Sequence, residues 1–339
     1  MPRHPPLPAP GRRLAVDGFA LGHGTDRAAG TGVTVILAPA EGAVAAADVR
    51  GSASGTRQFD SLVSPLHLAT RAHALVFAGG SGFGLSAADR VVGRLERRGI
   101  GFRTGLRPVP LVPTAILFDL GFGDPGASPG PDLVDAALAA AEASSPETEV
   151  ELGSVGAGTG ATVGKALGLE CAMKGGFGFA AFAEPDGPAV AAAVAVNAWG
   201  DVVDPDGGRT IAGCRTDPDS LELADARRVL ARLGPERGHP WQSNTTLAAV
   251  LTDAELTKLE ALKVCQMAFG GLHRALAPAL GLYDGDLVVT LASARRPAHV
   301  HAVGMLAERA VAAAIVAAVE AADGFGKIPA RRDLPEAAP

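Results

Sequence analysis

The chain has 339 residues, of which 47% are hydrophobic and 19% charged, a composition typical of a globular protein with a large core. Its formal net charge of −6 argues against a nucleic-acid-binding protein, which needs a cationic surface. The apolar run at residues 310–319 is far shorter than the roughly 20 residues that cross a bilayer, and the N-terminal segment lacks the apolar stretch of a signal peptide. We therefore expect a cytoplasmic protein without a nucleic-acid or membrane partner.

The cysteines and histidines do not indicate a disulfide framework or a metal site. Cys171, Cys214 and Cys265 are far apart in sequence and form no Cys-x-x-Cys pair, so we expect buried, reduced side chains. Among the eight histidines, His299 and His301 come closest to a ligand pair, and a surface turn explains them better. The sequence therefore predicts neither a metal nor a cofactor.

The first half of the chain opens with strands and continues with two helices. The run TGVTVILAP (residues 31–39) predicts a buried strand, and ALVFA (74–78) predicts a second. The glycine turn GGSGFG (79–84) follows, and its backbone N–H groups suit either an anion or close packing of a helix on the strand. One helix then ends at Gly99, and another covers 131–144.

The second half begins with a glycine-dense loop at residues 153–168 and ends with an alanine-rich helix. Between them the patterns predict strands at 177–183, 189–196, 245–253 and 287–292, an exposed linker at 216–243 with a helical centre at 220–233, and helices at 253–277 and 298–322. This mixture favours a layered α/β or α+β sandwich that forms one domain.

The dipeptide Asn244-Thr245 stands where the linker meets a strand. A threonine hydroxyl that attacks the preceding carbonyl produces an ester by an N-to-O shift, and hydrolysis of the ester leaves a threonine with a free α-amine. That amine, with a pKa of about 7.7–8.0, takes the proton of its own hydroxyl near neutral pH. A plain turn that begins a strand is the alternative.

Three further positions carry candidate chemistry. The turn Asp284-Gly285-Asp286 aims two carboxylates near one point, where they would hold an ammonium group, orient Thr245, bind a divalent cation, or face solvent. Lys165 follows glycine-rich backbone and would perturb the pKa of a nearby nucleophile. The amide of Asn197, at the end of a strand, would donate to an oxyanion.

Several motifs occur in the order typical of one family: GTGVTV, DVRG followed by GTR, GGSGFGLSAAD, VGAGTGATVGK, SNTT and LYDGD. In these motifs the chain resembles the DmpA-type self-cleaving aminopeptidases, which are N-terminal-nucleophile hydrolases. The family includes β-aminopeptidases and the NylC-type hydrolases of 6-aminohexanoate (nylon) oligomers, and the Asn-Thr junction is most similar to the latter.

The resemblance implies an αββα sandwich of the DmpA and ornithine-acetyltransferase kind. It also implies one domain over residues 14–325 after a flexible, proline-rich leader at 1–13. Self-cleavage would give the segments 1–244 and 245–339, which stay associated. We expect a homo-oligomer, with a tetramer favoured.

The resemblance also implies roles for individual residues. Cleavage after Asn244 would create the nucleophile Thr245, close to Lys165. Asn197 would help to stabilise the oxyanion. Asp284 and Asp286 would position the new N-terminus.

A second group of residues is implied for substrate binding. They are Gly80 and Ser81 in the glycine turn, and Phe118. In the nylon-oligomer hydrolases we expect a tyrosine at the position of Phe118, so the missing hydroxyl bears on the class of substrate more than on amide cleavage.

The main hypothesis is an amide hydrolase with an N-terminal threonine that acts on 6-aminohexanoate oligomers or short peptides through an acyl-enzyme. One alternative is a β-aminopeptidase or D-aminopeptidase. A second is acyl transfer to glutamate on the same fold, and a third is an uncleaved binding protein without catalytic activity.

Overall fold

The strand β13 (Ala189–Asn197) shows why this sequence forms a layered fold. The computed structural model describes residues 9–183, 187–232 and 244–335, and every residue of β13 is buried in it. Val190 and Val194 point into one hydrophobic core and Ala191 and Ala193 into another, because successive side chains of a strand point to opposite faces. A strand that is buried on both faces belongs to an inner layer.

The strand β13 lies in a six-stranded sheet with the order β12-β13-β16-β18-β3-β5. Its other strands are β12 (Gly176–Ala183), β16 (Thr245–Glu255), β18 (Leu287–Pro297), β3 (Ala43–Val49) and β5 (Arg71–Ala72). Neighbouring strands are antiparallel except β16 and β18, which are parallel. The N-terminal ends of β16 and β18 therefore lie side by side, and the segment before β16 lies beside the segment before β18.

A five-stranded sheet with the order β1-β2-β6-β9-β4 packs against the six-stranded sheet. Its strands are β1 (Ala20–Asp26), β2 (Thr31–Leu37), β6 (Ala74–Ala78), β9 (Thr114–Ile116) and β4 (Gly55–Arg57). Side chains from both sheets, including Leu75, Phe77, Phe177 and Leu247, form the core between them. Burial of these apolar surfaces holds the two sheets together.

Two helices cover the outer face of each sheet. α5 (Lys258–Ala275) and α6 (Val300–Glu320) pack on the six-stranded sheet, and α2 (Ala87–Arg97) and α3 (Pro131–Ala143) pack on the five-stranded sheet. α6 is long and apolar enough to span a membrane by length and composition alone, but 61% of its most apolar window is buried in the protein. Its contacts with α5, β12 and β13 account for its apolar sequence.

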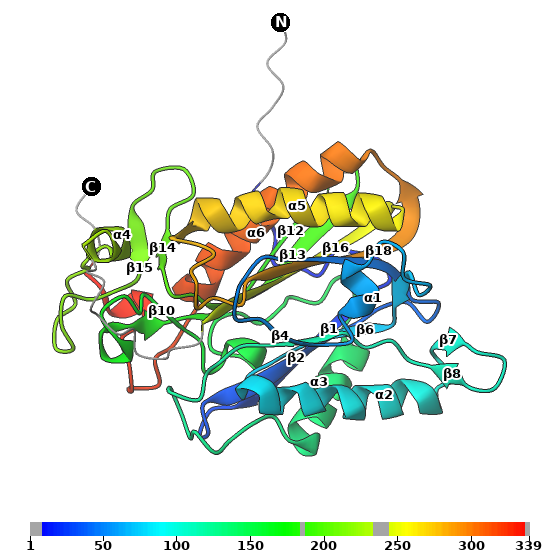
Figure 1. The fold of residues 1–339 in the computed structure, drawn as a ribbon, viewed down its shortest axis with the longest axis horizontal. Helices are drawn as coiled ribbons and strands as arrows, with labels where there is room; N and C mark the ends of the chain where they lie inside the picture. Colours follow the sequence, from blue (N-terminus) through cyan, green and yellow to red (C-terminus); the bar gives the residue numbers. More distant parts are fainter. Residues whose placement is uncertain (1–8, 184–186, 233–243, 336–339) are drawn as a thin grey trace, which may run out of the picture.

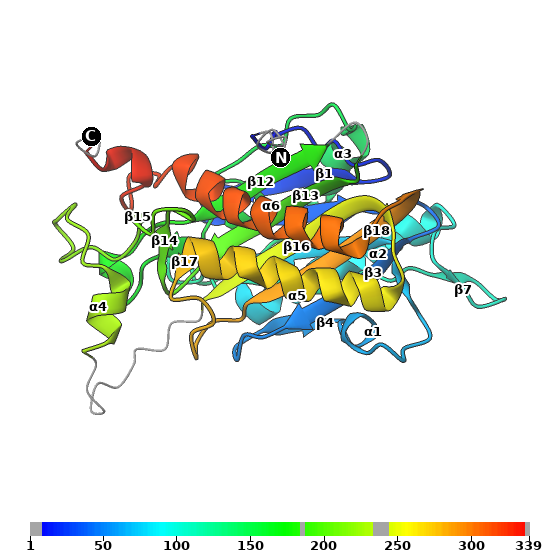
Figure 2. The ribbon, with the colours of Figure 1, turned by 90° about the horizontal axis from the view of Figure 1, so that it is seen from above.

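The layers follow one another in Figure 1 from α5 and α6, through the sheet with β13 and β16 and the sheet with β1 and β2, to α3 and α2. Figure 2, seen from above, shows α5 and α6 crossing the outer face of the six-stranded sheet. The αββα sandwich predicted from the sequence is confirmed.

Short elements connect these layers. They are α1 (Asp60–Val63), β7 (Phe102–Arg103), β8 (Pro108–Val109), β10 (Thr162–Val163), β11 (Met173–Lys174), β14 (Asp201–Val203), β15 (Thr210–Ala212), α4 (Ala226–Leu230) and β17 (Leu276–Ala277). Short 3-10 helices occur at Ser81–Ser86, Gly156–Gly158, Leu169–Cys171 and Arg331–Asp333. β10 and β11 pair with each other, and this small ribbon becomes part of the candidate site.

Two predicted helices differ from the structure. The helix expected at 253–277 begins only at Lys258, because β16 continues to Glu255 and Thr257 then caps the helix. The helix expected at 220–233 is reduced to the five residues of α4, and residues 233–243 lie outside the described residues. The three cysteines are buried and unpaired, as predicted.

The chain joins the sandwich before residue 14. Gly11 pairs with Ala181 through two backbone hydrogen bonds, and Arg13 forms a bridge with Glu149. Residues 1–8 of the predicted leader lie outside the described residues. The chain is therefore bound to the edge of β12 from residue 11, within the leader predicted at residues 1–13.

Candidate functional site

Thr245 is the first residue of β16 and is 1% exposed. In the register of β13 and β16 it lies opposite Asn197. Its hydroxyl donates a hydrogen bond to the carbonyl oxygen of Asn244, and the backbone N–H of Gly285 donates to the same oxygen at 2.9 Å. The hydroxyl is thus held against the 244–245 peptide bond, and the carbonyl of that bond is polarised by a second donor.

The position of Gly285 requires glycine. A Cβ at this position would lie 2.7 Å from Thr245 Oγ1 and 2.9 Å from the Cα of Ser54. Any side chain would displace either the Thr245 hydroxyl or the backbone at residues 53–54. The glycine of the Asp-Gly-Asp turn therefore lets the turn approach the threonine closely.

Lys165 contacts Asn197 directly. Both are buried, and Lys165 Nζ donates to the backbone oxygen and to the side-chain Oδ1 of Asn197, each at 3.0 Å. Burial lowers the pKa of Lys165 to about 7, although the carboxylates of Asp284 and Asp286 act in the opposite direction. The buried site therefore favours the neutral amine more than water does.

The orientation of the Asn197 amide is fixed by its partners. Oδ1 also accepts the backbone N–H of Thr162 at 2.9 Å, and Nδ2 donates to the backbone oxygen of Phe118 at 2.9 Å. Because donors face Oδ1 and an acceptor faces Nδ2, the amide cannot flip without losing these hydrogen bonds. Within residues 9–183, 187–232 and 244–335, Phe118 is the acceptor recorded for Nδ2, so its second hydrogen remains for another acceptor.

Asp284 and Asp286 use all four carboxylate oxygens to bind backbone N–H groups. Asp286 accepts from Thr246 at 2.6 Å and from Leu280 at 3.0 Å. Asp284 accepts from Trp199 at 3.2 Å and from Gly281 at 2.8 Å. The pair thus ties the start of β16 to the turn before β18, and each oxygen retains a second lone pair.

Both carboxyl groups are almost completely buried, at 1% exposed. Burial raises the pKa of each, and the charge of Asp286 raises the pKa of Asp284 further. Lys165 lowers the pKa of Asp284. The three groups therefore form one buried electrostatic unit whose protonation states depend on one another.

The glycine turn reaches this site through the segment 117–119. Ser81 donates its backbone N–H to the oxygen of Leu117 at 3.1 Å, and Gly80 donates to Asp119 Oδ1 at 2.6 Å. Phe118 contributes its backbone oxygen, which accepts from Asn197. The structure thus links the three residues implied for substrate binding to Asn197 through backbone groups and the Asp119 carboxylate.

Two charged residues beside this site, Asp119 and Lys174, were not predicted from the sequence. Asp119 is 4% exposed and Lys174 is completely buried. No spacing pattern marks either one, because most of their partners, such as Gly80 and Thr31 for Asp119 and Gly158 for Lys174, lie well away from them in sequence. Their burial only becomes evident from the fold.

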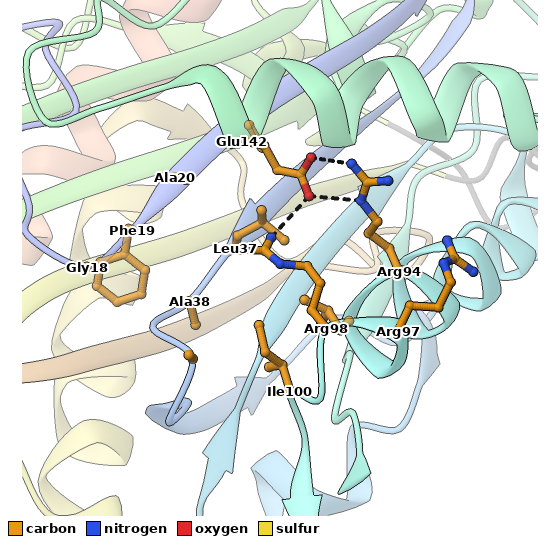
Figure 3. Close-up of a pocket in the computed structure, with 13 residues that line it drawn as sticks. Gly18, Phe19, Ala20, Leu37, Ala38, Arg94, Arg97, Arg98, Ile100 and Glu142 are labelled. Atoms are coloured by element: carbon orange, nitrogen blue, oxygen red, sulfur yellow. Dashed lines mark hydrogen bonds and ion pairs between the residues drawn. The ribbon is translucent and has the colours of Figure 1, made fainter.

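A separate pocket of about 630 Å³ lies at the opposite end of β18. Gly18 and Phe19 form part of its wall, and Glu142 accepts hydrogen bonds from Arg94 and Arg98 beside it (Figure 3). The Ser293 hydroxyl of β18 donates to the backbone oxygen of Asp17, next to Gly18. Six strand residues separate Ser293 from Asp286, a distance of about 23 Å along the strand. This pocket is therefore remote from Thr245.

The similarity of this chain to known proteins identifies its family. The family model described as peptidase family S58 matches residues 14–324. The chain belongs to peptidase family S58. This membership confirms the resemblance seen in the sequence motifs and makes the chain a hydrolase of peptide or amide bonds.

Curated relatives of this S58 peptidase carry two kinds of name. An uncharacterized aminopeptidase of Mycobacterium leprae is 36% identical over 319 residues, which cover 88% of this chain and 84% of the relative. A 6-aminohexanoate-oligomer endohydrolase of a Kocuria species is 29% identical over 279 residues, which cover 81% of this chain and 72% of the relative.

Solved structures share the fold of this S58 peptidase. A β-aminopeptidase of a Burkholderia species superposes with a TM-score of 0.69 at 20% identity, covering 96% of this chain and 93% of the other. An L-aminopeptidase D-Ala-esterase/amidase of Ochrobactrum anthropi, described as a variant of the Ntn hydrolase fold, gives a TM-score of 0.66 at 18% identity, covering 94% and 89%.

Proposed function

We propose that this S58 peptidase is a self-cleaving amide hydrolase whose nucleophile is Thr245. The observation that carries the proposal is the contact between the Thr245 hydroxyl and the carbonyl of Asn244, in a buried position where Gly285 donates to the same oxygen. A hydroxyl held beside its own preceding carbonyl supports attack on that carbonyl, which is the first step of an N-to-O shift.

Self-cleavage follows in two steps. Thr245 Oγ1 attacks the carbonyl carbon of Asn244, the C–N bond breaks, and the hydroxyl proton passes to the departing amine. The Gly285 N–H stabilises the charge that develops on the carbonyl oxygen. Water then hydrolyses the ester, which gives a carboxylate on Asn244 and a free α-amine on Thr245.

Turnover uses the new amine as the base. It takes the proton of Oγ1 while Oγ1 attacks the substrate amide carbon, and the leaving amine of the substrate carries a proton away. Asn197 Nδ2 donates its second hydrogen to the oxyanion, and Lys165 holds Asn197 Oδ1. Water releases the acyl group from Oγ1 and restores the hydroxyl.

The proposal is tested by the intact mass of the purified protein under denaturing conditions. We expect two fragments, the smaller one beginning Thr-Thr-Leu, and a single full-length chain for Thr245→Ala. Thr245→Ser, which keeps a hydroxyl, should still cleave. A wild-type chain that remains full-length after long incubation, or turnover by Thr245→Ala, would contradict the assignment.

The substrates that we propose are linear amides with a free amine, such as 6-aminohexanoate oligomers or short peptides. Relatives named aminopeptidases and 6-aminohexanoate-oligomer endohydrolases support this class. A matched pair of anilides, one with a free amine and one acetylated, should show a preference for the free amine. Equal rates would argue against recognition of the amine.

The alternative of acyl transfer is separated in the same assay. With glutamate added, a transferase would form an acyl-glutamate, whereas a hydrolase releases only the free acid. We expect the free acid as the main product.

A further inference from the structure

The ammonium group of Lys174, in β11, has three backbone acceptors. Nζ donates to Gly158 at 2.9 Å, to Ala161 at 2.8 Å and to Gly175 at 3.2 Å. These bonds use every hydrogen of an ammonium group. The Phe122 ring, 5.3 Å from Nζ, adds a favourable cation–π contact.

One peptide group connects Lys174 to Asn197. The carbonyl of Ala161 accepts from Lys174 Nζ, and the N–H of the same peptide, which belongs to Thr162, donates to Asn197 Oδ1 at 2.9 Å. The same oxygen also accepts the N–H of Gly175 at 2.8 Å, and each donor on the oxygen of a peptide polarises it and strengthens the hydrogen bond that its N–H makes, the charged donor most strongly. The ribbon of β10 and β11 places Thr162 opposite Lys174 and keeps this geometry.

Asp119 supports the same arrangement from the other side of Asn197. Its carboxylate accepts the backbone N–H of Gly80 at 2.6 Å and the Thr31 hydroxyl at 2.8 Å. These bonds hold Asp119 in place, and the residue before it, Phe118, has the backbone oxygen that accepts from Asn197 Nδ2. Burial lowers the pKa of Lys174 to about 7, and the charge of Asp119 opposes this shift. Asp119 thus favours the charged form of the lysine.

We propose that Lys174 is a positioning residue for Asn197, which it orients and polarises through the 161–162 peptide. The inference rests on the proposed function, in which Asn197 donates to the oxyanion during turnover. In self-cleavage the scissile oxygen already has the Gly285 N–H as donor. Lys174 therefore serves turnover more than self-cleavage.

The test compares Lys174→Met with a matched control, Lys258→Met. Lys258 is also buried and donates to one backbone oxygen, that of Ser61, at 2.7 Å, but it lies at the start of α5, beyond the far end of β16. The substrate is 6-aminohexanoyl or β-alanyl p-nitroanilide, whichever the wild type hydrolyses faster. Self-cleavage of each variant is checked by its intact mass under denaturing conditions before the kinetics are measured.

For Lys174→Met we expect normal self-cleavage and a KM within about twofold of wild type. The kcat should fall by about 10- to 100-fold. This is a smaller loss than the roughly 100- to 1,000-fold that results from removing an oxyanion donor itself. Lys258→Met should keep kcat within about twofold. A merely structural role would lower the fraction of folded enzyme, which reduces the apparent kcat at an unchanged KM. The kcat is therefore expressed per mole of folded, self-cleaved enzyme, and on that basis a merely structural role leaves it unchanged.

Three results would overturn the inference. They are an unchanged kcat in Lys174→Met, a raised KM at constant kcat, and loss of self-cleavage in a soluble, folded variant. If Lys174→Met does not give soluble protein, Lys174→Gln replaces it, and a kcat at least threefold below wild type at constant KM is expected. Failure of the proposed function is distinct, because wild type would then be as uncleaved and inactive as Thr245→Ala.

Discussion

Asp201, in β14, is a buried carboxyl group with a structural task. It is 1% exposed and accepts the backbone N–H groups of Cys214 at 2.7 Å and Ala226 at 2.8 Å. Burial raises its pKa to about 6, although these two hydrogen bonds lower it. It therefore anchors the segment that runs toward residue 244 at the cost of carrying a buried charge at neutral pH.

This predicts a pH-dependent stability. Because the folded pKa lies above the unfolded value, the contribution of Asp201 is fully present below about pH 4 and is lost as the pH rises through about 6. From pH 5 to 7.5, the free energy of unfolding should fall by about 1–2 kcal/mol more in the parent than in Asp201→Asn. Urea unfolding in the uncleaved Thr245→Ala background measures this.

Asp204→Asn is the control for that measurement. Asp204 lies in the turn that follows β14, and the N–H groups of Asp206 and Gly207 lower its pKa. It is therefore ionised across the whole range, and its replacement should leave the pH slope unchanged. A slope that is the same with and without Asp201 would refute the prediction.

At the residue level, short motifs could be predicted and long-range partners could not. Thr245 and the two aspartates stand in dense local patterns, and the structure brings them together. Asp119 and Lys174 act on backbone groups that only the folded chain delivers, such as the Gly80 N–H, 39 residues away in sequence. A single lysine or aspartate in an apolar context gives no such signal.

At the level of elements, the start of α5 depends on a capping box. The Thr257 hydroxyl accepts the backbone N–H of Glu260, and the Glu260 carboxylate accepts that of Thr257. Thr257→Ala should lower the free energy of unfolding by about 1 kcal/mol, because the first turn loses an acceptor. Urea unfolding of uncleaved protein measures the change.

The matched variant is Thr257→Ser, which keeps the hydroxyl and should remain within about 0.5 kcal/mol of the parent. If alanine and serine prove equivalent, the cap contributes nothing to the stability of α5. The boundary at Lys258 would then follow from the end of β16 alone.

The strand β3 is an element that the sequence pattern does not predict. Its sequence, AVAAADV, is rich in alanine, which is depleted in strands, so it was not predicted. The structure makes it a strand because it pairs with β18 over six residues and buries its alanines against both neighbouring layers. Tertiary pairing here overrides weak local propensity.

For the whole molecule, the position of β16 determines what self-cleavage would do. Residues 245–335 contain β16, α5, β18 and α6. β16 pairs with β13 over eight residues, and β18 pairs with β3 over six. A break before Thr245 therefore leaves the smaller segment in the centre of the sheet.

We expect the two fragments to remain together in a native mass spectrum and in gel filtration, and to separate only in denaturant. After cleavage, unfolding should become concentration-dependent, whereas uncleaved Thr245→Ala should not show this dependence. Fragments that separate in native buffer would contradict the pairing of β16 with both of its neighbours.

At this scale the sandwich followed from the family resemblance and from continuous apolar runs, which are typical of strands buried on both faces. Strand order did not follow. The parallel pairing of β16 and β18 places Thr245 beside the Asp-Gly-Asp turn, and it joins strands separated by the whole of α5. Local periodicity carries no information about such a pairing.

That pairing also means that one stretch of polypeptide carries the proposed nucleophile, the turn that holds it and the helix that joins them. A two-gene version of the protein, with residues 1–244 and 245–339 synthesised as separate chains, would present a threonine N-terminus directly once the initiator methionine is removed. Reassembly of the two halves would yield an enzyme that never passes through a precursor. Its activity would then depend on whether both chains are expressed together.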